Sequence, residues 1–215
     1  MSAFPVILSA PSGGGKTSIA HRLLEARGDV GYSVSCTTRP PRPGERHGVD
    51  YYFLSPEEFL RQQARGEFAE SAEVHGHLYG TLRSEVQRVL GEGKCVLMDI
   101  DVQGAMQFRR VFPDAVLVFV LPPSAEQLLQ RLRGRGTENA HTLAARLASA
   151  LVELQAVHEY QYVIVNDDLQ RATDRVSRII DAEGSRRERL HGLEAEVRGM
   201  IERLEREVQS YSNPV

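Results

Sequence analysis

The chain has 215 residues, of which 41% are hydrophobic and 26% are charged, and its formal net charge is -3. These values are typical of a globular protein with a core of its own, and the acidic balance argues against a general nucleic-acid binder. The N-terminus has no signal-peptide pattern and no apolar run is long enough to cross a membrane, so we expect a cytoplasmic protein without membrane contacts.

The first elements alternate between apolar runs and turn-forming residues. The apolar run 6–9 predicts a buried strand, and the spacing of Ile19 and Leu23 predicts a helix over about 17–26. Residues 39–48 are rich in Pro, Gly and Arg, which indicates a loop.

Residues 50–80 predict a second group of elements. A strand is expected at 50–54, and Ser55 followed by Glu58 three residues later predicts the start of a helix over 56–65. Residues 68–80 indicate short strands and turns. Their two-residue period places Phe68 and Glu70 on the same face.

The second half of the chain alternates regularly. Buried strands are predicted at 95–100, 116–121 and 162–165, and helices at 103–110, 124–132 and 142–158. Strands that alternate with helices predict an α/β fold, in which helices flank a parallel sheet. Three further segments are expected around this core, which comprises 1–34 and 86–182: an inserted lobe at 35–85, a small lid at about 131–146, and a tail at 183–215.

The tail predicts a charged helix over 183–209. Its apolar residues step by three and four along a narrow row: Leu190, Leu193, Val197, Met200 and Leu204. A helix docked on its own domain is the favoured interpretation of this row. Contact between subunits of a homo-oligomer is the alternative, and both remain open.

A Gly-rich loop joins the first strand to the first helix. Its residues are Ser9, Ala10, Pro11, Ser12, Gly13, Gly14, Gly15, Lys16 and Thr17. Such a P-loop binds the phosphates of ATP through backbone N–H groups and the helix N-terminus, with Lys16 on the β- and γ-phosphates and Thr17 on Mg²⁺. Ala10 replaces the first glycine of the usual pattern.

An acidic strand end supports the same interpretation. The apolar run 96–98 leads to Asp99, and the carboxyl end of a parallel strand faces the ligand crevice. Asp99 can therefore organise Mg²⁺ through water. The two cysteines, Cys36 and Cys95, have neither metal-ligand nor disulfide spacing, and we expect small core residues.

Several short stretches occur in the chain in an order that is more specific than any one of them alone. They are Ser35 to Glu45 (SCTTRPPRPGE), Glu70, Tyr79 to Thr81 (YGT), Asp99 to Gly104 (DIDVQG), Arg133 to Gly136 (RGRG) and Val165 to Asp168 (VNDD). In these residues the chain resembles the guanylate kinase family, of bacterial type, from about residue 5 to 182. The resemblance implies an ATP:GMP phosphotransferase with a P-loop NTPase fold, ATP and GMP as substrates, and dGMP as a further acceptor.

The resemblance also implies a GMP site in the inserted lobe. Its phosphate would be bound by Arg39, Arg42, Tyr51 and Tyr79, with Glu45 bracing an arginine, and its guanine by Ser35, Glu70 and Thr81, with Asp101 close to the acceptor. Guanidinium forks suit phosphate oxygens. A carboxylate can accept from both guanine N1–H and N2–H₂, whereas adenine has an acceptor at N1, so Glu70 selects guanine.

For the lid, the resemblance implies that Arg131, Arg135 and Arg146 contact the ATP phosphates and that Asn166 lies near the adenine. With Lys16, Arg39 and Asp99, these arginines form the expected catalytic set, because spreading positive charge over the transferring phosphoryl group stabilises its transition state.

Two alternatives compete with this interpretation. A non-catalytic guanylate-kinase-like binding module would not need Lys16, Thr17 and the lid arginines. A kinase for another small acceptor would not need the guanine set of Ser35, Glu70 and Thr81. An assay of ADP release over several acceptors separates the three.

Overall fold

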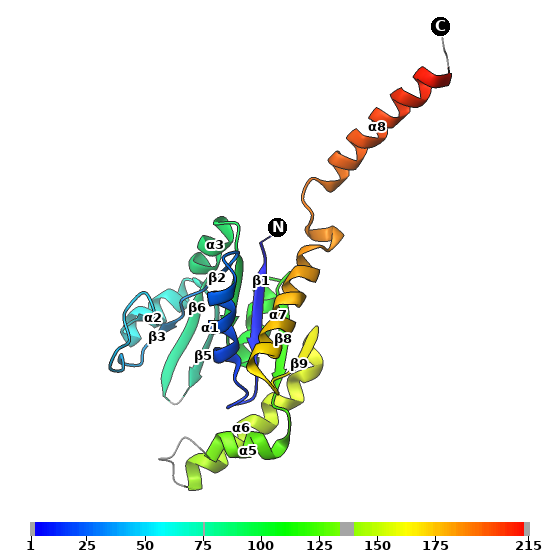
Figure 1. Ribbon diagram of the computed structural model, residues 1–215. Coiled ribbons are helices and arrows are strands. Elements are labelled where there is room, and N and C mark those ends of the chain that lie inside the picture. Colours follow the sequence, from blue (N-terminus) through cyan, green and yellow to red (C-terminus); the bar gives the residue numbers. More distant parts are fainter. Residues whose placement is uncertain (1–2, 75, 134–139, 213–215) are drawn as a thin grey trace.

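The structure, a computed structural model, describes residues 3–74, 76–133 and 140–212 (Figure 1). A five-stranded sheet in the order β2-β7-β1-β8-β9 forms its centre, and every neighbouring pair in it is parallel. The strands are β1 (Pro5–Ser9), β2 (Val30–Tyr32), β7 (Cys95–Asp99), β8 (Val116–Leu121) and β9 (Tyr162–Val165). The predicted parallel sheet is thereby confirmed, while the short edge strand β2 was not predicted.

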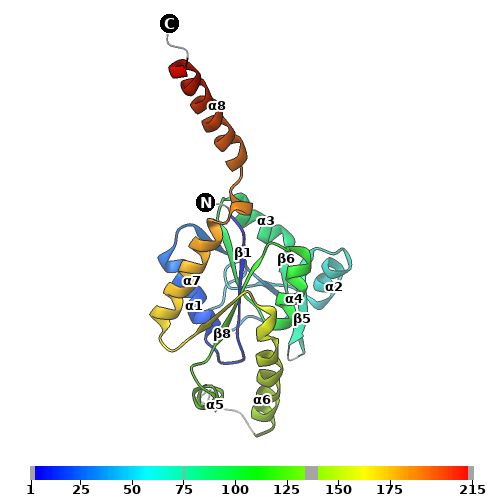
Figure 2. The same ribbon diagram turned by 90° about the vertical axis from the view of Figure 1, so that its right-hand side faces the viewer.

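Helices cover both faces of this sheet because its strands bury side chains in both directions. Figure 2 shows α1 (Lys16–Ala26) and α7 (Leu169–Gly184) on one side and α4 (Val102–Val111) on the other. Val6 and Leu8 pack with the first pair, whereas Ile7, between them, packs with α4 and α3 (Arg83–Gly91). This alternation explains why the strands are apolar throughout.

A second sheet of four strands lies beside the first, in the order β4-β3-β6-β5. Its elements are β3 (Cys36–Thr37), β4 (Tyr52–Phe53), β5 (Phe68–Val74), β6 (His77–Leu82) and the helix α2 (Pro56–Ala64). The predicted start of α2 is confirmed, since the Ser55 side chain accepts a hydrogen bond from the Glu58 N–H (3.1 Å).

The hairpin of β5 and β6 corrects one prediction. A β-bulge shifts the register between Phe68 and Glu70. Phe68 stacks on Phe59 of α2 with ring centroids 4.4 Å apart, whereas Glu70 faces α4, as does Ala69. The two side chains therefore do not share a face, because the extra residue of a bulge breaks the two-residue alternation.

The segment expected as a lid, about 131–146, includes the end of α5 (Ala125–Arg133) and the start of α6 (Ala140–Gln155), and the short helix η1 (Ala156–Glu159) leads from α6 back to β9. Leu128, Leu132 and Ala150 are the buried residues of a small cluster between the two helices. In Figures 1 and 2 these helices lie at the end of the molecule opposite the C-terminus.

The C-terminal region differs from the predicted single helix over 183–209. Glu183 belongs to α7 and is 2% exposed; after η2 (Arg187–Arg189), a new helix α8 begins at Leu193 and runs to Ser212. Gly192, with φ +82°, lies at this break, in the left-handed region that glycine adopts readily. No helix within the described residues is long and apolar enough to span a membrane.

The favoured docking of the tail on its own domain is also wrong. In both views α8 extends away from the remainder of the molecule (Figures 1 and 2). Its apolar side chains are exposed, among them Val197 (43%), Met200 (55%) and Leu204 (66%).

Candidate active site

The Gly-rich loop between β1 and α1 has the backbone of a phosphate cradle. Gly13 (φ +83°) and Gly15 (φ +91°) adopt left-handed conformations, as glycines do in loops that wrap phosphate oxygens, and Gly15 caps α1. Lys16 is half-buried at the first position of the helix. The loop therefore presents donors, a lysine and a helix N-terminus to one anion.

Ala10 fits this loop because Gly14 leaves room for it. A Cβ placed on Gly14 would lie 2.6 Å from the Cβ of Ala10, and Ala10 itself is 1% exposed. The Gly14 N–H donates to the Pro11 carbonyl (2.7 Å), which closes the turn. The methyl group of Ala10 thus occupies the space of a side chain that position 14 does not have.

Asp99 links the loop to the sheet. Thr17 Oγ1 donates to its Oδ2 (2.6 Å), and the Tyr32 hydroxyl, from the neighbouring strand β2, donates to its Oδ1 (2.7 Å). Thr17 and Asp99 were predicted to cooperate, whereas Tyr32 was missed. Oxygen donors of this kind suit Mg²⁺, so these residues fit the expected ion.

The helices α5 and α6 contact the loop through two arginines that were predicted to lie near it. Arg131 Nη1 donates to the carbonyls of Gly13 and Gly14, both at 3.4 Å. Arg146, 8% exposed, lies against the Ser12 hydroxyl (3.4 Å). Arg135 lies outside the described residues.

α6 also places a carboxylate on the loop that sequence analysis missed. The Ser12 N–H donates to Glu153 Oε2 (2.8 Å). Burial raises the pKa of Glu153, while the bond from Ser12 and the charge of Lys16 lower it. Since Glu153 follows Arg146 by seven residues, two helical turns, both reach Ser12 from one face of α6.

Asn166 follows β9 and is 6% exposed. Its Nδ2 donates to the Gly14 carbonyl (3.0 Å), and a Cβ on Gly15 would lie 2.4 Å from it. The side chain is therefore held against the phosphate loop, and its role at the adenine stays a prediction.

On the inserted lobe, the residues expected at the acceptor phosphate gather around Arg39. Its Nη2 donates to both carboxylate oxygens of Glu45 (2.9 and 3.0 Å), so an arginine is braced by Glu45. The guanidinium lies 5.5 Å from the centre of the Tyr51 ring and hydrogen-bonds Tyr79. Arg42 is exposed, and its backbone N–H donates to Glu45 (2.7 Å).

The residues expected at the base form a buried polar pair. Thr81 Oγ1 donates to Glu70 Oε1 (2.6 Å), and a Cβ on Gly104 would lie 2.8 Å from Glu70 Oε2. Burial raises the pKa of Glu70 to about 7; the charge of Asp101 also raises it, and the bond from Thr81 lowers it. Ser35 is half-buried beside this sheet, where its carbonyl accepts from Tyr52 N–H (2.9 Å).

The two halves of the expected site meet at the β7–α4 junction, where Glu70 lies against Gly104. Burial raises the pKa of Tyr51, and the negative charge of Asp99 raises it further. Asp101, two residues further on, caps α4 by accepting from Gly104 N–H (2.7 Å). The β7–α4 junction thus adjoins both halves.

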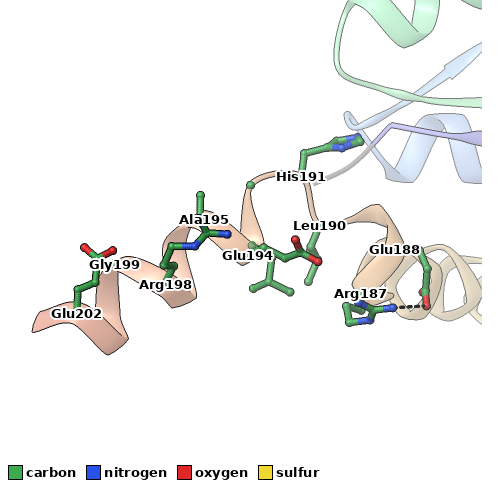
Figure 3. Close-up of a pocket in the computed structure, with 11 residues that line it drawn as sticks. Arg187, Glu188, Leu190, His191, Glu194, Ala195, Arg198, Gly199 and Glu202 are labelled. Carbon is green, nitrogen blue, oxygen red and sulfur yellow. Dashed lines mark ion pairs between the residues drawn. The ribbon is translucent and has the colours of Figure 1, made fainter. Parts of the chain in front are cut away.

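A concave region lies away from this site, at the bend between η2 and α8. Figure 3 shows its lining residues, which include the ion pair of Arg187 with Glu188 (3.8 Å) and the side chains of Glu194 and Arg198. Its lining residues all come from one short segment of the chain and carry charges of both signs. They do not form a recognisable catalytic group.

Comparison with known proteins agrees with this geometry. The family model described as guanylate kinase matches residues 2–183. A guanylate kinase of Syntrophotalea carbinolica is 48% identical over 86% of this chain and 88% of its own, and one of Thermotoga maritima is 44% identical over 90% and 95%. A crystal structure of guanylate kinase from Anaplasma phagocytophilum superposes with a TM-score of 0.74 at 38% identity, over 90% of this chain and 93% of that chain.

Proposed function

The chain belongs to the guanylate kinase family, and from this premise we propose that it transfers the γ-phosphate of ATP to GMP, giving ADP and GDP. The observation that carries the choice of acceptor is the buried Glu70, which is 7% exposed and has one oxygen bonded to Thr81. An ionised carboxylate in this position can accept from the two N–H donors of guanine. Because the assigned residues contact only the base and the phosphate, we extend the proposal to dGMP.

On the donor side, the loop from Ala10 to Thr17 and the side chain of Lys16 bind the phosphates of ATP. Arg131, Arg146 and, from the sequence, Arg135 add positive charge around the γ-phosphoryl group. Thr17 would hold Mg²⁺ directly and Asp99 would hold it through water, and the ion would supply positive charge that neutralises the phosphates. Asn166 supports the adenine end of this site.

On the acceptor side, Arg39, Arg42, Tyr51 and Tyr79 hold the phosphate of GMP, and Glu45 fixes Arg39. Ser35, Glu70 and Thr81 hold the guanine, and Asp101 keeps the end of α4 in place beside them. A GMP phosphate oxygen then attacks the γ-phosphorus, the bond to the bridging oxygen of ADP breaks, and that oxygen keeps the electron pair. Positioning and charge neutralisation are sufficient for this step, so no covalent enzyme intermediate forms.

We assign these tasks to separate parts of the chain. Residues 1–34 and 86–182 bind ATP, with the lid at about 131–146, and residues 35–85 bind GMP. The exposed apolar row on α8 is proposed to join copies of the chain into a homo-oligomer. Both cysteines are buried free thiols, as is typical of the reducing cytoplasm, where we place the protein.

The test is ADP release from ATP with GMP, dGMP, AMP, UMP or CMP as acceptor. We expect rapid release with GMP and dGMP alone. Release that is the same with and without acceptor, or preference for another acceptor, would contradict the proposal.

A matched pair of lysine variants identifies the site of this activity. Lys16→Ala should lower turnover by ~10³-fold or more, as expected for loss of a charge-stabilising group. Lys94→Ala, in which the lost ammonium is bonded to exposed Glu92 (3.0 Å), should leave turnover unchanged. Near-normal turnover of Lys16→Ala would show that the loop is not the catalytic P-loop.

A further inference from the structure

We propose that Tyr32 is a positioning residue for phosphoryl transfer: its hydroxyl fixes the Asp99 carboxylate so that the other oxygen faces Thr17. The inference rests on the proposed function and extends it to a residue outside the Gly-rich loop and outside the stretches that resemble the family. It starts from one contact, the 2.7 Å hydrogen bond from Tyr32 to Asp99 Oδ1.

The topology explains why this tyrosine reaches Asp99. β2 is the edge strand next to β7, and Tyr32 pairs with Leu97, two residues before Asp99. Residues two apart point to the same face of a sheet, so the long side chain of Tyr32 extends along that face to the strand end. Tyr32 is itself half-buried between the core and the insert.

A carboxylate at this place needs two anchors. Rotation about the Cβ–Cγ bond of aspartate is broad and nearly two-fold, so one hydrogen bond leaves the plane of the group poorly defined. Thr17 holds Oδ2 at 2.6 Å and Tyr32 holds Oδ1 at 2.7 Å, one short hydroxyl bond to each oxygen. Hydroxyl bonds to a charged carboxylate at such distances are among the stronger ones in proteins.

The orientation matters for the Thr17 hydroxyl. This group has one hydrogen and two acceptor lone pairs. Since the hydrogen points to Asp99, the lone pairs are directed elsewhere and are available to a cation. Tyr32 therefore acts through Asp99 on the group that would bind Mg²⁺, as outer partners do at many metal sites.

Tyr32→Phe removes the hydroxyl and keeps the ring. We expect kcat with ATP and GMP to fall ~10- to 100-fold, the range for loss of an outer partner of a metal ligand, while KM for GMP stays unchanged. A binding measurement without turnover gives the independent readout. In calorimetric titration, the variant should bind ADP with Mg²⁺ ~10-fold more weakly than the unmodified protein does. In the presence of EDTA, the two proteins should bind ADP equally well.

Tyr162→Phe is the matched control. Its hydroxyl also donates to a carboxylate, Glu183 (2.5 Å), but from β9 at the opposite edge of the sheet. It should alter thermal stability without altering the effect of Mg²⁺ on ADP binding. In a double-mutant cycle, Tyr32→Phe should have less than a ~2-fold effect on the Mg²⁺ dependence once Asp99 is replaced by Ala, because the two act as one unit.

Two results would overturn the proposal. One is that Tyr32→Phe leaves the Mg²⁺ dependence of ADP binding unchanged. The other is that Tyr32→Phe weakens Mg²⁺-dependent ADP binding equally in the unmodified protein and in Asp99→Ala. Binding of ADP with EDTA also reports whether each variant is folded, so a folding defect is separated from a loss of positioning. If the unmodified protein failed to phosphorylate GMP, the proposed function would fail, while the Mg²⁺ dependence of ADP binding would still test Tyr32.

Discussion

Among single residues, Glu70 gives the sharpest dependence on pH. Its pKa is raised to about 7, mainly by burial, and guanine recognition needs the ionised form. Protonation replaces an acceptor by a donor, so kcat/KM for GMP should fall as the pH is lowered below about 7, approaching ~10-fold per pH unit. The N–H donors of guanine favour the ionised form, so GMP binding below pH 7 should release a proton. Titration in two buffers of different ionisation enthalpy measures this, and a flat profile from pH 6 to 8 would contradict it.

Replacing the same residue tests its choice of base. Glu70→Gln keeps the shape but turns one acceptor into a donor, which opposes a guanine N–H and can pair with adenine N1. GMP turnover should fall by up to ~10⁴-fold, while the small AMP activity holds or rises. The proposed contacts of Arg39 and Tyr79 with the GMP phosphate should be unchanged, so kcat/KM for both nucleotides separates base from phosphate effects. If the ratio of kcat/KM for GMP to that for AMP did not change, recognition of the base would have to be assigned to Ser35 and Thr81 alone.

Some residues of this site are marked by sequence motifs, whereas others are recognised only in the structure. Arg39, Glu45, Glu70 and Thr81 occur in recognisable order, and the pairs Arg39–Glu45 and Glu70–Thr81 are present in the structure. Tyr32 is separated from its partner by 67 residues and lies in a three-residue strand, so no local pattern marks it. Distant partners of this kind become visible only when the topology is known.

At the scale of elements, the contact between β5 and α4 is close enough to be tested by one methyl group. Gly104→Ala places a Cβ 2.8 Å from Glu70 Oε2 and 3.3 Å from its Cδ, so Glu70 must shift. Since a displacement of about 1 Å in a positioned group can cost ~10²-fold, we expect kcat/KM for GMP to fall by that order, with KM for ATP unchanged.

Gly91→Ala is the control for this change, because it too adds a methyl group within a helix, where no atom lies within 4 Å. It should behave as the unmodified protein does. Equal kinetics for the Gly104 and Gly91 variants would show that Glu70 does not need its observed position.

The link between α7 and α8 sets where the chain can be shortened. The carboxylate of Glu183 accepts from Arg189 Nη2 (3.3 Å), whose guanidinium also lies 4.1 Å from the centre of the Phe4 ring. Removing residues after 184 breaks this buried pair and should lower the free energy of unfolding by about 3 kcal/mol. Removing residues after 190 keeps this pair, so turnover and the unfolding free energy of the single chain should stay unchanged, although the apolar row proposed to join copies is lost. Urea unfolding of the two forms decides, and equal stability would contradict the boundary.

The elements differ in how well the sequence predicts them. β8 and β9 have the predicted bounds because both are continuous apolar runs. β8 is buried on both faces, whereas the edge strand β9 exposes Val163 (48%). β4 lies inside the strand predicted at 50–54 but is shorter, and β3, of two residues, is too short to show any period. α7 was omitted although Ala172, Val176 and Ile180 recur every four residues and all are buried, so its signal was present.

The whole molecule separates its chemistry from its C-terminal helix. The helices α5 and α6 lie at one end in both views and α8 at the other, with the sheet between them (Figures 1 and 2). The carboxyl ends of β1 and β7 carry the phosphate loop and Asp99, the place where open parallel sheets bind ligands. The parallel arrangement of the strands therefore predicts where this site lies. No rule of this kind predicts from the sequence that α8 extends into solvent.

The direction of α8 also affects how the protein moves through water. A helix of 20 residues is ~30 Å long, while a compact domain as large as the whole chain has a radius of gyration of only ~17 Å. A single copy is therefore elongated, with more friction and slower tumbling than a sphere of 24.0 kDa. Gel filtration would then overstate its mass and could suggest a dimer where there is one chain. Sedimentation equilibrium does not depend on shape, and it is the measurement that can count the copies.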